Sequence, residues 1–433
     1  MPGLSPKPFR RFNRVILGIT FGILAVFTAF NTWINPLWVT KAPWTNEKFA
    51  EYRPIYRQQR TGKAGIARST PWEVGFFGSS RVDIAFDPML PGWQGKKAVN
   101  LAVSAGTLPE TAGILRYTVD HCPLKVAIVG IDLGDISGSG SGIKSTGYME
   151  SPFNPKGDAV ERELRYLSGV STFTSAVNTL KYWNRRNKPD FVLPEYTPQG
   201  HRLRHQDKPN VAAGMHKDAI PHAMKGARRR SKIAETNAAK GGSGLPADEE
   251  KVRLTRQILS DCAKHGVALK IVIPPNHSTY ISVYYYSGDP DPNFSTDRRT
   301  LVQLVAESNK AHPEAPPAEI WDFNEFHELC SEPLPTTKEG RLHWFLDGTH
   351  ARKALGDIMQ ARIMGWPIEG PGADFGVKLT EENLQSRLDG LKSAYEDFQK
   401  KHPDEFQWMV DGIKSYQTSG KEAEKEPEGG QEF

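Results

Sequence analysis

Two short segments near opposite ends of the chain contain the residue types that acyl chemistry needs. Gly78-Ser79-Ser80-Arg81 follows an apolar run, and Asp347-Gly348-Thr349-His350 precedes a helical pattern. A serine on a sharp strand-to-helix turn becomes a nucleophile when a histidine takes its proton and a carboxylate orients that histidine. The two segments therefore predict a hydrolase-like site of Ser80, His350 and Asp347, if one fold brings them together.

Each segment also has a simpler interpretation when it is taken alone. Gly-Ser-Ser is ordinary helix-capping chemistry, and Asp-Gly-Thr-His forms a good turn before a helix. The combination of the two segments is what favours catalysis.

The elements that must position these residues alternate between strands and helices. Apolar runs predict strands at residues 74–77, 99–103, 125–132, 268–273 and 319–323. Helical patterns cover residues 107–121, 248–265, 297–310 and 352–364. This alternation predicts an α/β fold with a parallel sheet, in which ligands bind at the carboxyl ends of the strands.

The N-terminal region predicts a membrane anchor. An apolar run from Val15 to Phe30 is followed by Trp33 and Trp38, and basic residues precede it: Lys7, Arg10, Arg11 and Arg14. This order is typical of a transmembrane helix with a cytoplasmic N-terminus, so most of the chain should lie outside the cytoplasm. A cleaved signal peptide is the alternative, but the residues after Ala29 lack the small side chains that cleavage needs.

These features divide the chain into five expected regions. They are a cytoplasmic basic N-terminus (1–14), a transmembrane anchor (15–38), a stalk (39–70), an α/β domain (71–366) and a helical and disordered tail (367–433). The α/β domain contains an insertion at about 135–245 that is poor in apolar residues and includes a basic tract at 201–232. We expect this insertion to be a partly disordered lid or arm.

Composition excludes several classes of function. The net charge of +5 is mild, and the basic tract nearly lacks the aromatic residues that would stack on nucleic-acid bases. The three cysteines are too few and too scattered for a disulfide framework, and no histidine spacing suits a metal. We therefore expect neither a nucleic-acid partner nor a metal or other cofactor.

The two chemical segments, their order and the α/β pattern between them resemble the SGNH, or GDSL-type, hydrolase superfamily. With the anchor, Asn35-Pro36-Leu37-Trp38 and Asn100-Leu-Ala-Val-Ser-Ala-Gly106, the chain resembles bacterial membrane-anchored SGNH-like proteins that work beside membrane-bound O-acyltransferases on surface polysaccharides. The resemblance implies a three-layer flavodoxin-like sandwich at the inner membrane, with its main domain extracytoplasmic. It also implies an acidic or acylated polysaccharide and a membrane-bound O-acyltransferase as partners.

The resemblance assigns Ser80 as nucleophile, His350 as base and Asp347 as its support. The backbone N–H of Gly106 would face the oxyanion, and Arg81 and Asn100 are further candidates for binding oxyanion or substrate. The third motif departs from the family, because Asp132 stands where an amide donor is expected. An ionised carboxylate only accepts hydrogen bonds, and losing one oxyanion donor costs about 3 to 4 kcal/mol.

Three alternatives stay open at this point. The chain could be an SGNH-like esterase or O-acyltransferase, or a scaffold of that fold without activity. It could also be an α/β-hydrolase with Ser104 as nucleophile, because Ala102-Val-Ser104-Ala-Gly106 resembles a nucleophile elbow. Pro275-Asn276-His277 and Asp322 could contact the site, although a loop-shaping role and a solvated strand end are the simpler interpretations.

Overall fold

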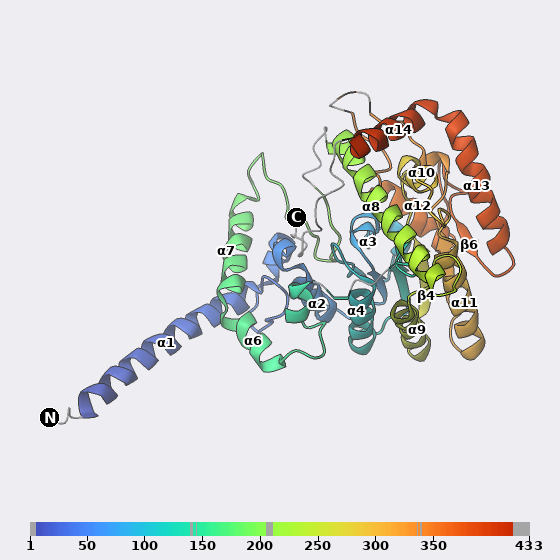
Figure 1. Cartoon of the computed structure of the whole chain (residues 1–433). Coiled ribbons are helices and arrows are strands. Elements are labelled where there is room, and N and C mark those ends of the chain that lie inside the picture. The colour runs from blue at the N-terminus through green and yellow to red at the C-terminus, as the bar shows by residue number, and fades with distance from the viewer. Residues whose placement is uncertain are drawn as a thin grey trace, which may run out of the picture. The chain divides into compact units, whose positions relative to one another are not determined.

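The computed structural model describes residues 6–138, 142–143, 145–204, 211–335, 337 and 340–418 (Figure 1). The chain forms two compact units, each built from separate stretches of sequence. Unit 1 comprises Met1–Ser69 and Ser145–Pro198, and unit 2 comprises Thr70–Lys144 and Gln199–Phe433. This division differs from the expected one, because half of the insertion belongs with the N-terminal region and the tail belongs with the α/β domain.

Unit 1 is helical. Its elements are α1 (Pro6–Ile34), the 3₁₀ helices η1 (Glu47–Tyr52) and η2 (Tyr56–Gln58), α2 (Gln59–Ser69), α5 (Thr146–Glu150), α6 (Ala159–Ser168) and α7 (Val170–Arg185). The segment Phe9–Ile34 is long and apolar enough to cross a membrane. At the end of α1, Ile34 packs with Phe49 and Ala176 in a small apolar core.

The expected stalk is folded. Nine of the eleven residues of α2, from Gln59 to Ala67, are buried, and α2 contacts α5. Gly65 shows how close this packing is, because a Cβ at that position would lie 2.1 Å from the carbonyl oxygen of Leu37. Residues 39–69 therefore belong to unit 1.

Unit 2 is built on a six-stranded sheet with the order β2-β1-β3-β4-β5-β6. The strands are β1 (Val74–Phe77), β2 (Ala98–Asn100), β3 (Val126–Gly130), β4 (Ala268–Ile273), β5 (Glu319–Asp322) and β6 (Val377–Leu379). The first five are parallel, and β6 pairs antiparallel with β5. The predicted α/β class and parallel sheet are confirmed.

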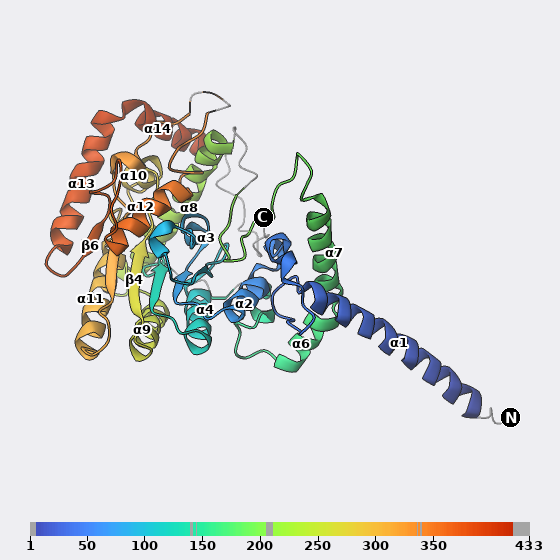
Figure 2. The same ribbon diagram turned by 180° about the vertical axis from the view of Figure 1, so that it is seen from behind.

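Both faces of this sheet are covered. Val74 and Phe76 of β1 belong to one apolar core with residues of α3 (Ser80–Ala85) and α12 (Lys353–Met364). Their neighbours Gly75 and Phe77 are also buried, and side chains alternate along a strand, so these must face the opposite layer. There α4 (Leu108–His121), α9 (Glu249–Lys264) and α11 (Ser295–Ala311) stand side by side (Figures 1 and 2).

The remaining described elements complete unit 2. They are η3 (Pro91–Trp93), α8 (Val211–Ala239), α10 (Ser278–Tyr286), η4 (Glu328–Cys330), α13 (Leu384–Lys401) and α14 (Pro403–Thr418). Helices α8, α10 and α14 pack together around an apolar core that includes Met224, Val283 and Met409. The described part of the insertion is thus ordered, and the tail as far as Thr418 is packed, because both bury apolar side chains. The expected disordered end, 421–433, lies outside the described residues.

Candidate active site

Ser80 lies at the carboxyl end of β1, on a turn that only glycine can make. Gly78 has φ +140°, and a Cβ there would lie 3.1 Å from the carbonyl oxygen of Gly130. Ser79 then caps α3, since its hydroxyl oxygen accepts the backbone N–H of Arg81. Ser80 is consequently the first residue of α3, and it lies where the carboxyl ends of the strands meet.

The Asp347–His350 loop is held by hydrogen bonds to one carboxylate. Asp347 Oδ1 accepts the backbone N–H groups of Thr349 and His350 at 2.8 and 2.9 Å. Burial alone would raise the pKa of Asp347, but the charge and hydrogen bond of His350 and these N–H groups outweigh it. The pKa of Asp347 therefore lies well below its ordinary value, and the group stays ionised at neutral pH.

The three predicted residues form one hydrogen-bonded chain. Ser80 Oγ lies 2.8 Å from His350 Nε2, and His350 Nδ1 lies 2.7 Å from Asp347 Oδ2. An ionised Asp347 accepts the Nδ1 proton, which leaves Nε2 free to accept the proton of Ser80. The arrangement has the order of a nucleophile, a general base and an orienting carboxylate.

Arg81 holds the loops of the site together. Its buried guanidinium donates to the carbonyl oxygens of Thr349, Pro274 and Pro275, and to Asp132 Oδ1 at 3.3 Å. The loops after β1, β3 and β4 and the Asp347–His350 loop thus share one side chain. These acceptors occupy the N–H groups of the Arg81 guanidinium. Its contacts therefore indicate that Arg81 positions the loops of the site.

Asp132 lies at the carboxyl end of β3, next to the turn that carries Ser80. Its Oδ2 accepts the hydroxyl of Ser79 at 2.8 Å, and its Oδ1 pairs with Arg81. The carboxylate is therefore neutralised by an arginine beside it. This pairing offsets the repulsion that an isolated Asp132 would exert on a developing oxyanion.

Two residues expected to bind oxyanion or substrate are otherwise engaged. The N–H of Gly106 donates to the carbonyl of Val103 at 3.0 Å, so it closes a turn. Asn100 is fully buried; its amide donates to the carbonyls of Val82 and Phe86, and its oxygen accepts the N–H of Ala102. These contacts join β2 to α3, and the polar groups of both residues are directed at backbone groups, an arrangement that does not favour the expected binding role.

Ser104 does not join the histidine. Its hydroxyl accepts a hydrogen bond from Arg202 Nη1 at 2.8 Å. A guanidinium has no lone pair to take a proton, so this partner cannot activate a serine. Ser104 also follows β2, the edge strand, and this position does not favour the α/β-hydrolase alternative.

The loop after β4 supports the site without entering it. The backbone N–H of His277 donates to the carbonyl of Gly348 at 3.0 Å, and the His277 ring is bonded to Thr279 and Glu332. Asn276 donates to Asn324. The interpretation of Pro275-Asn276-His277 as a loop-shaping segment agrees with these contacts.

Asp322 lies buried in β5 between two arginines and is not a solvated strand end. Its carboxylate accepts from Arg298 and Arg387 at 2.9 and 3.0 Å. Although burial raises the pKa of Asp322, the two guanidinium charges outweigh that effect and lower it.

Sequence reasoning missed the contribution of α8 to the site. A Cβ at position 348 would lie 3.0 Å from Ala219 Cβ, so α8 packs directly on the Asp347–His350 loop. One turn later lies His222, whose pKa is lowered mainly by burial and by Lys225, with smaller effects from the charges of Asp347 and His350. The basic tract gave no signal of this packing, because its apolar residues are few and widely spaced.

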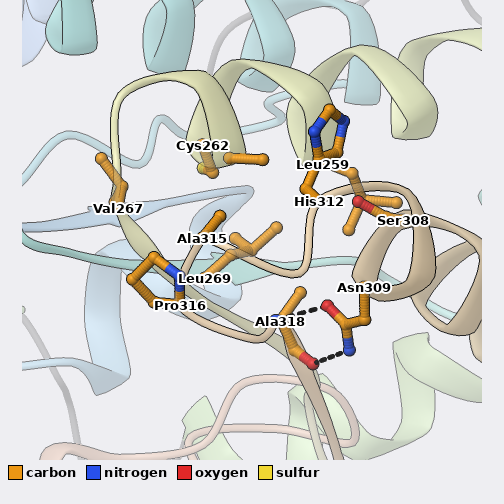
Figure 3. Close-up of a pocket in the computed structure, with 11 residues that line it drawn as sticks. Leu259, Cys262, Val267, Leu269, Ser308, Asn309, His312, Ala315, Pro316 and Ala318 are labelled. Carbon is orange, nitrogen blue, oxygen red and sulfur yellow. Dashed lines mark hydrogen bonds between the residues drawn. The ribbon is translucent and has the colours of Figure 1, made fainter.

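A small cavity at the other end of the sheet is unrelated to this site (Figure 3). Its volume is about 10 Å³, and Cys262, Leu269 and Asn309 are among the residues around it, so it has room for about one water molecule. It lies at the start of β4, and burial raises the pKa of the Cys262 thiol to about 12. The cavity is too small for a substrate.

Comparisons with models of known protein families and with curated proteins find no match for this chain.

Proposed function

We propose that this chain is a membrane-anchored serine esterase or O-acyltransferase of the SGNH type that acts on an acylated surface glycan. The observation that carries the proposal is the hydrogen-bonded chain Ser80–His350–Asp347, assembled from segments 270 residues apart. Helices on both faces of a sheet with the order β2-β1-β3-β4-β5 support the three-layer flavodoxin-like arrangement.

In the acylation step, Ser80 Oγ attacks the carbonyl carbon of an ester while its proton moves to His350 Nε2. The tetrahedral intermediate collapses as His350 returns that proton to the departing alcohol oxygen, and an acyl ester forms on Ser80. Asp347 keeps its charge and stabilises the imidazolium between these transfers.

In the second step, water or a sugar hydroxyl attacks the acyl carbonyl. His350 takes the proton of this nucleophile and returns one to Ser80 Oγ as the ester breaks. Water gives the free acid, and a sugar hydroxyl gives a new acylated sugar. The same residues therefore serve hydrolysis and transfer.

The oxyanion must be stabilised differently from the pattern that the resemblance implies. Within the part of the chain that the structure describes, the backbone N–H of Ser80 donates to no acceptor. It lies at the start of α3, where backbone donors stabilise negative charge. We assign this N–H as the main oxyanion donor and leave Gly106 and Asp132 out of that role.

The partners follow from two features. The segment Phe9–Ile34 provides the anchor, which we place in the inner membrane with the main domain extracytoplasmic. On α8, which packs on the Asp347–His350 loop at Ala219, Lys225 and Arg229 are four residues apart and share one helix face. This cationic face suits an acidic polysaccharide, and a membrane-bound O-acyltransferase would supply or receive the acyl group.

A second candidate is a scaffold of the same fold without activity. Asp132, in the position where the family has an amide donor, favours it, because the carboxylate accepts from Ser79 and Arg81 and donates to nothing. In that case the site would bind an acylated glycan or the acyltransferase without turnover.

Labelling with a serine-directed fluorophosphonate distinguishes the two candidates. The full chain in detergent would be compared with Ser80→Ala and His350→Ala, and Ser104→Ala is the matched control. The enzyme proposal expects labelling of the wild type and of Ser104→Ala, with loss in the other two variants. A folded wild type that takes no label supports the scaffold, and loss only in Ser104→Ala supports the α/β-hydrolase alternative.

A further inference from the structure

One surface of unit 1 exposes large apolar side chains beside the anchor helix. We call residues Ala159–Phe173, from the start of α6 to the first turn of α7, the α6–α7 elbow. Val160, Leu164 and Val170 of this elbow are 70 %, 58 % and 73 % exposed. Val160 and Leu164 are four residues apart on one helix, so they share a face.

The elbow is joined to α1 by aromatic contacts. The ring of Phe173 lies 4.6 Å from that of Phe27 and 5.4 Å from that of Phe30, measured between centroids. Asn31 also donates its amide hydrogen to the carbonyl of Leu167 at 2.9 Å. These contacts therefore hold the elbow beside residues 27–31 of α1.

Residues 27–31 fall within the outer part of a bilayer. If Arg14 marks the inner boundary, a hydrocarbon core about 30 Å thick ends about 20 residues later, near Ile34. Phe27 then lies about 10 Å below the outer boundary and Phe30 about 6 Å below it. Trp44, which is exposed and bonded to Thr32, stands at the interfacial level that tryptophan prefers.

The charged side chains of the elbow are paired. Arg165 bonds Glu161 at 2.6 Å, and Glu163 lies 3.7 Å from Arg68. Arg162 donates to two backbone carbonyls, those of Ser151 and Asn154. Pairing lowers the cost of bringing these groups near lipid.

We propose that the α6–α7 elbow inserts its exposed apolar side chains into the outer leaflet of the bilayer that α1 spans. The occupant of this surface is lipid, because α6 and α7 contact α1, whose apolar side chains are exposed from Phe9 to Val26. The inference rests on the proposed membrane anchoring. Unit 1 would thus be held at two points, by the anchor and by the elbow, and α1 could not rotate freely about its axis.

Spin labelling of the full chain in lipid nanodiscs tests the proposal. A nitroxide would be attached at Val170→Cys, and its accessibility to oxygen, which concentrates in lipid, would be compared with that to a water-soluble nickel chelate. The matched control is Val192→Cys, which is 53 % exposed in the same unit. Its neighbour Phe191 packs on Tyr182, near the far end of α7. The three native cysteines are buried, and the unsubstituted chain sets the background.

We expect the label at residue 170 to collide at least about threefold more with oxygen than with the nickel chelate, and the label at residue 192 to show the reverse. A label at Phe21→Cys, an exposed position of α1, reports the anchor separately. If residue 21 lies in lipid while residue 170 is as open to nickel as residue 192, the elbow proposal fails and the anchor stands. If residue 21 is open to nickel, the anchor itself fails. A label at residue 170 that is shielded from both reagents means that protein covers the elbow, which also overturns the proposal.

Discussion

The loops after β1 and β2 end neighbouring parallel strands, and each carries a serine within hydrogen-bond distance of a basic side chain. Ser80 pairs with a histidine that can take its proton, whereas Ser104 pairs with an arginine that cannot. Asn100 ties the second loop to backbone, and Arg81 ties the first to the loops of the site. The chemistry of the partner, more than the position at the carboxyl end of the sheet, therefore decides which of the two serines could be activated.

The sharpest test of this difference is the removal of each hydroxyl. Ser80→Ala should lower kcat for an activated acetyl ester by about 10⁶-fold, because the nucleophile of the proposed mechanism is gone. Ser104→Ala should stay within about twofold. Steady-state hydrolysis of 4-nitrophenyl acetate measures both, and equal losses in the two variants would contradict the comparison.

Asp347→Asn should have the next largest effect. An amide at this position favours the wrong tautomer of His350, which should cost about 10⁴-fold in kcat with a small change in KM. Arg202→Ala, which removes the partner of Ser104, is the matched control and should change kcat less than about threefold. A loss below tenfold in Asp347→Asn would mean that the carboxylate does not orient the base.

Asn100→Ala should change stability instead of activity. The substitution leaves buried backbone groups at Val82, Phe86 and Ala102 without their partner, and each such group costs about 1 to 3 kcal/mol. We expect a loss of about 3 kcal/mol in the free energy of unfolding in urea, with KM for the acetyl ester unchanged in the folded protein. A raised KM at unchanged stability would return Asn100 to substrate binding.

The smallest effect concerns the third neighbouring loop, after β3. Burial, and then the charge of Asp132, raise the pKa of Asp135 to about 7. A carboxyl group whose pKa is higher in the folded state than in the unfolded state, where it is about 3.9, makes stability fall as pH rises between these values. Asp135→Asn should therefore gain stability relative to the wild type from pH 4 to pH 7 and level off above. Thermal unfolding across this range measures the difference, and a stability difference that does not change with pH would contradict the prediction.

Local patterns predicted much of the α/β unit. The strands at 74–77 and 268–273 and the helix after Thr107 have the expected bounds, because continuous apolar runs and a proline-containing capping box are local signals. The pairing of Ser80 with His350 also agrees with expectation. The sequence could not indicate that Gly106 and Asn100 face backbone, since that depends on where each loop turns after its strand.

The arrangement of the insertion and the tail depends on distant contacts. Strand β6 has three residues and is stabilised by pairing with β5, and α8 is held by α10 and α14. Helices α6 and α7 are separated only by Gly169, where a Cβ would lie 2.3 Å from the carbonyl oxygen of Arg165. These features depend on tertiary packing, so the periodicity of the sequence does not predict them.

The discontinuity of unit 1 has a consequence for synthesis on the ribosome. Phe27 finds its ring partner Phe173 only after about 150 further residues have been made, which takes roughly 7 to 30 seconds at ordinary rates of translation. During that interval β1, β2 and β3 are already complete, but the end of α1 and the segment after it have none of their later partners. Phe49, which follows α1, packs on Trp183. A nascent chain stalled before residue 145 should therefore leave the segment around Phe49 exposed to proteases, and one stalled well after residue 198 should protect it.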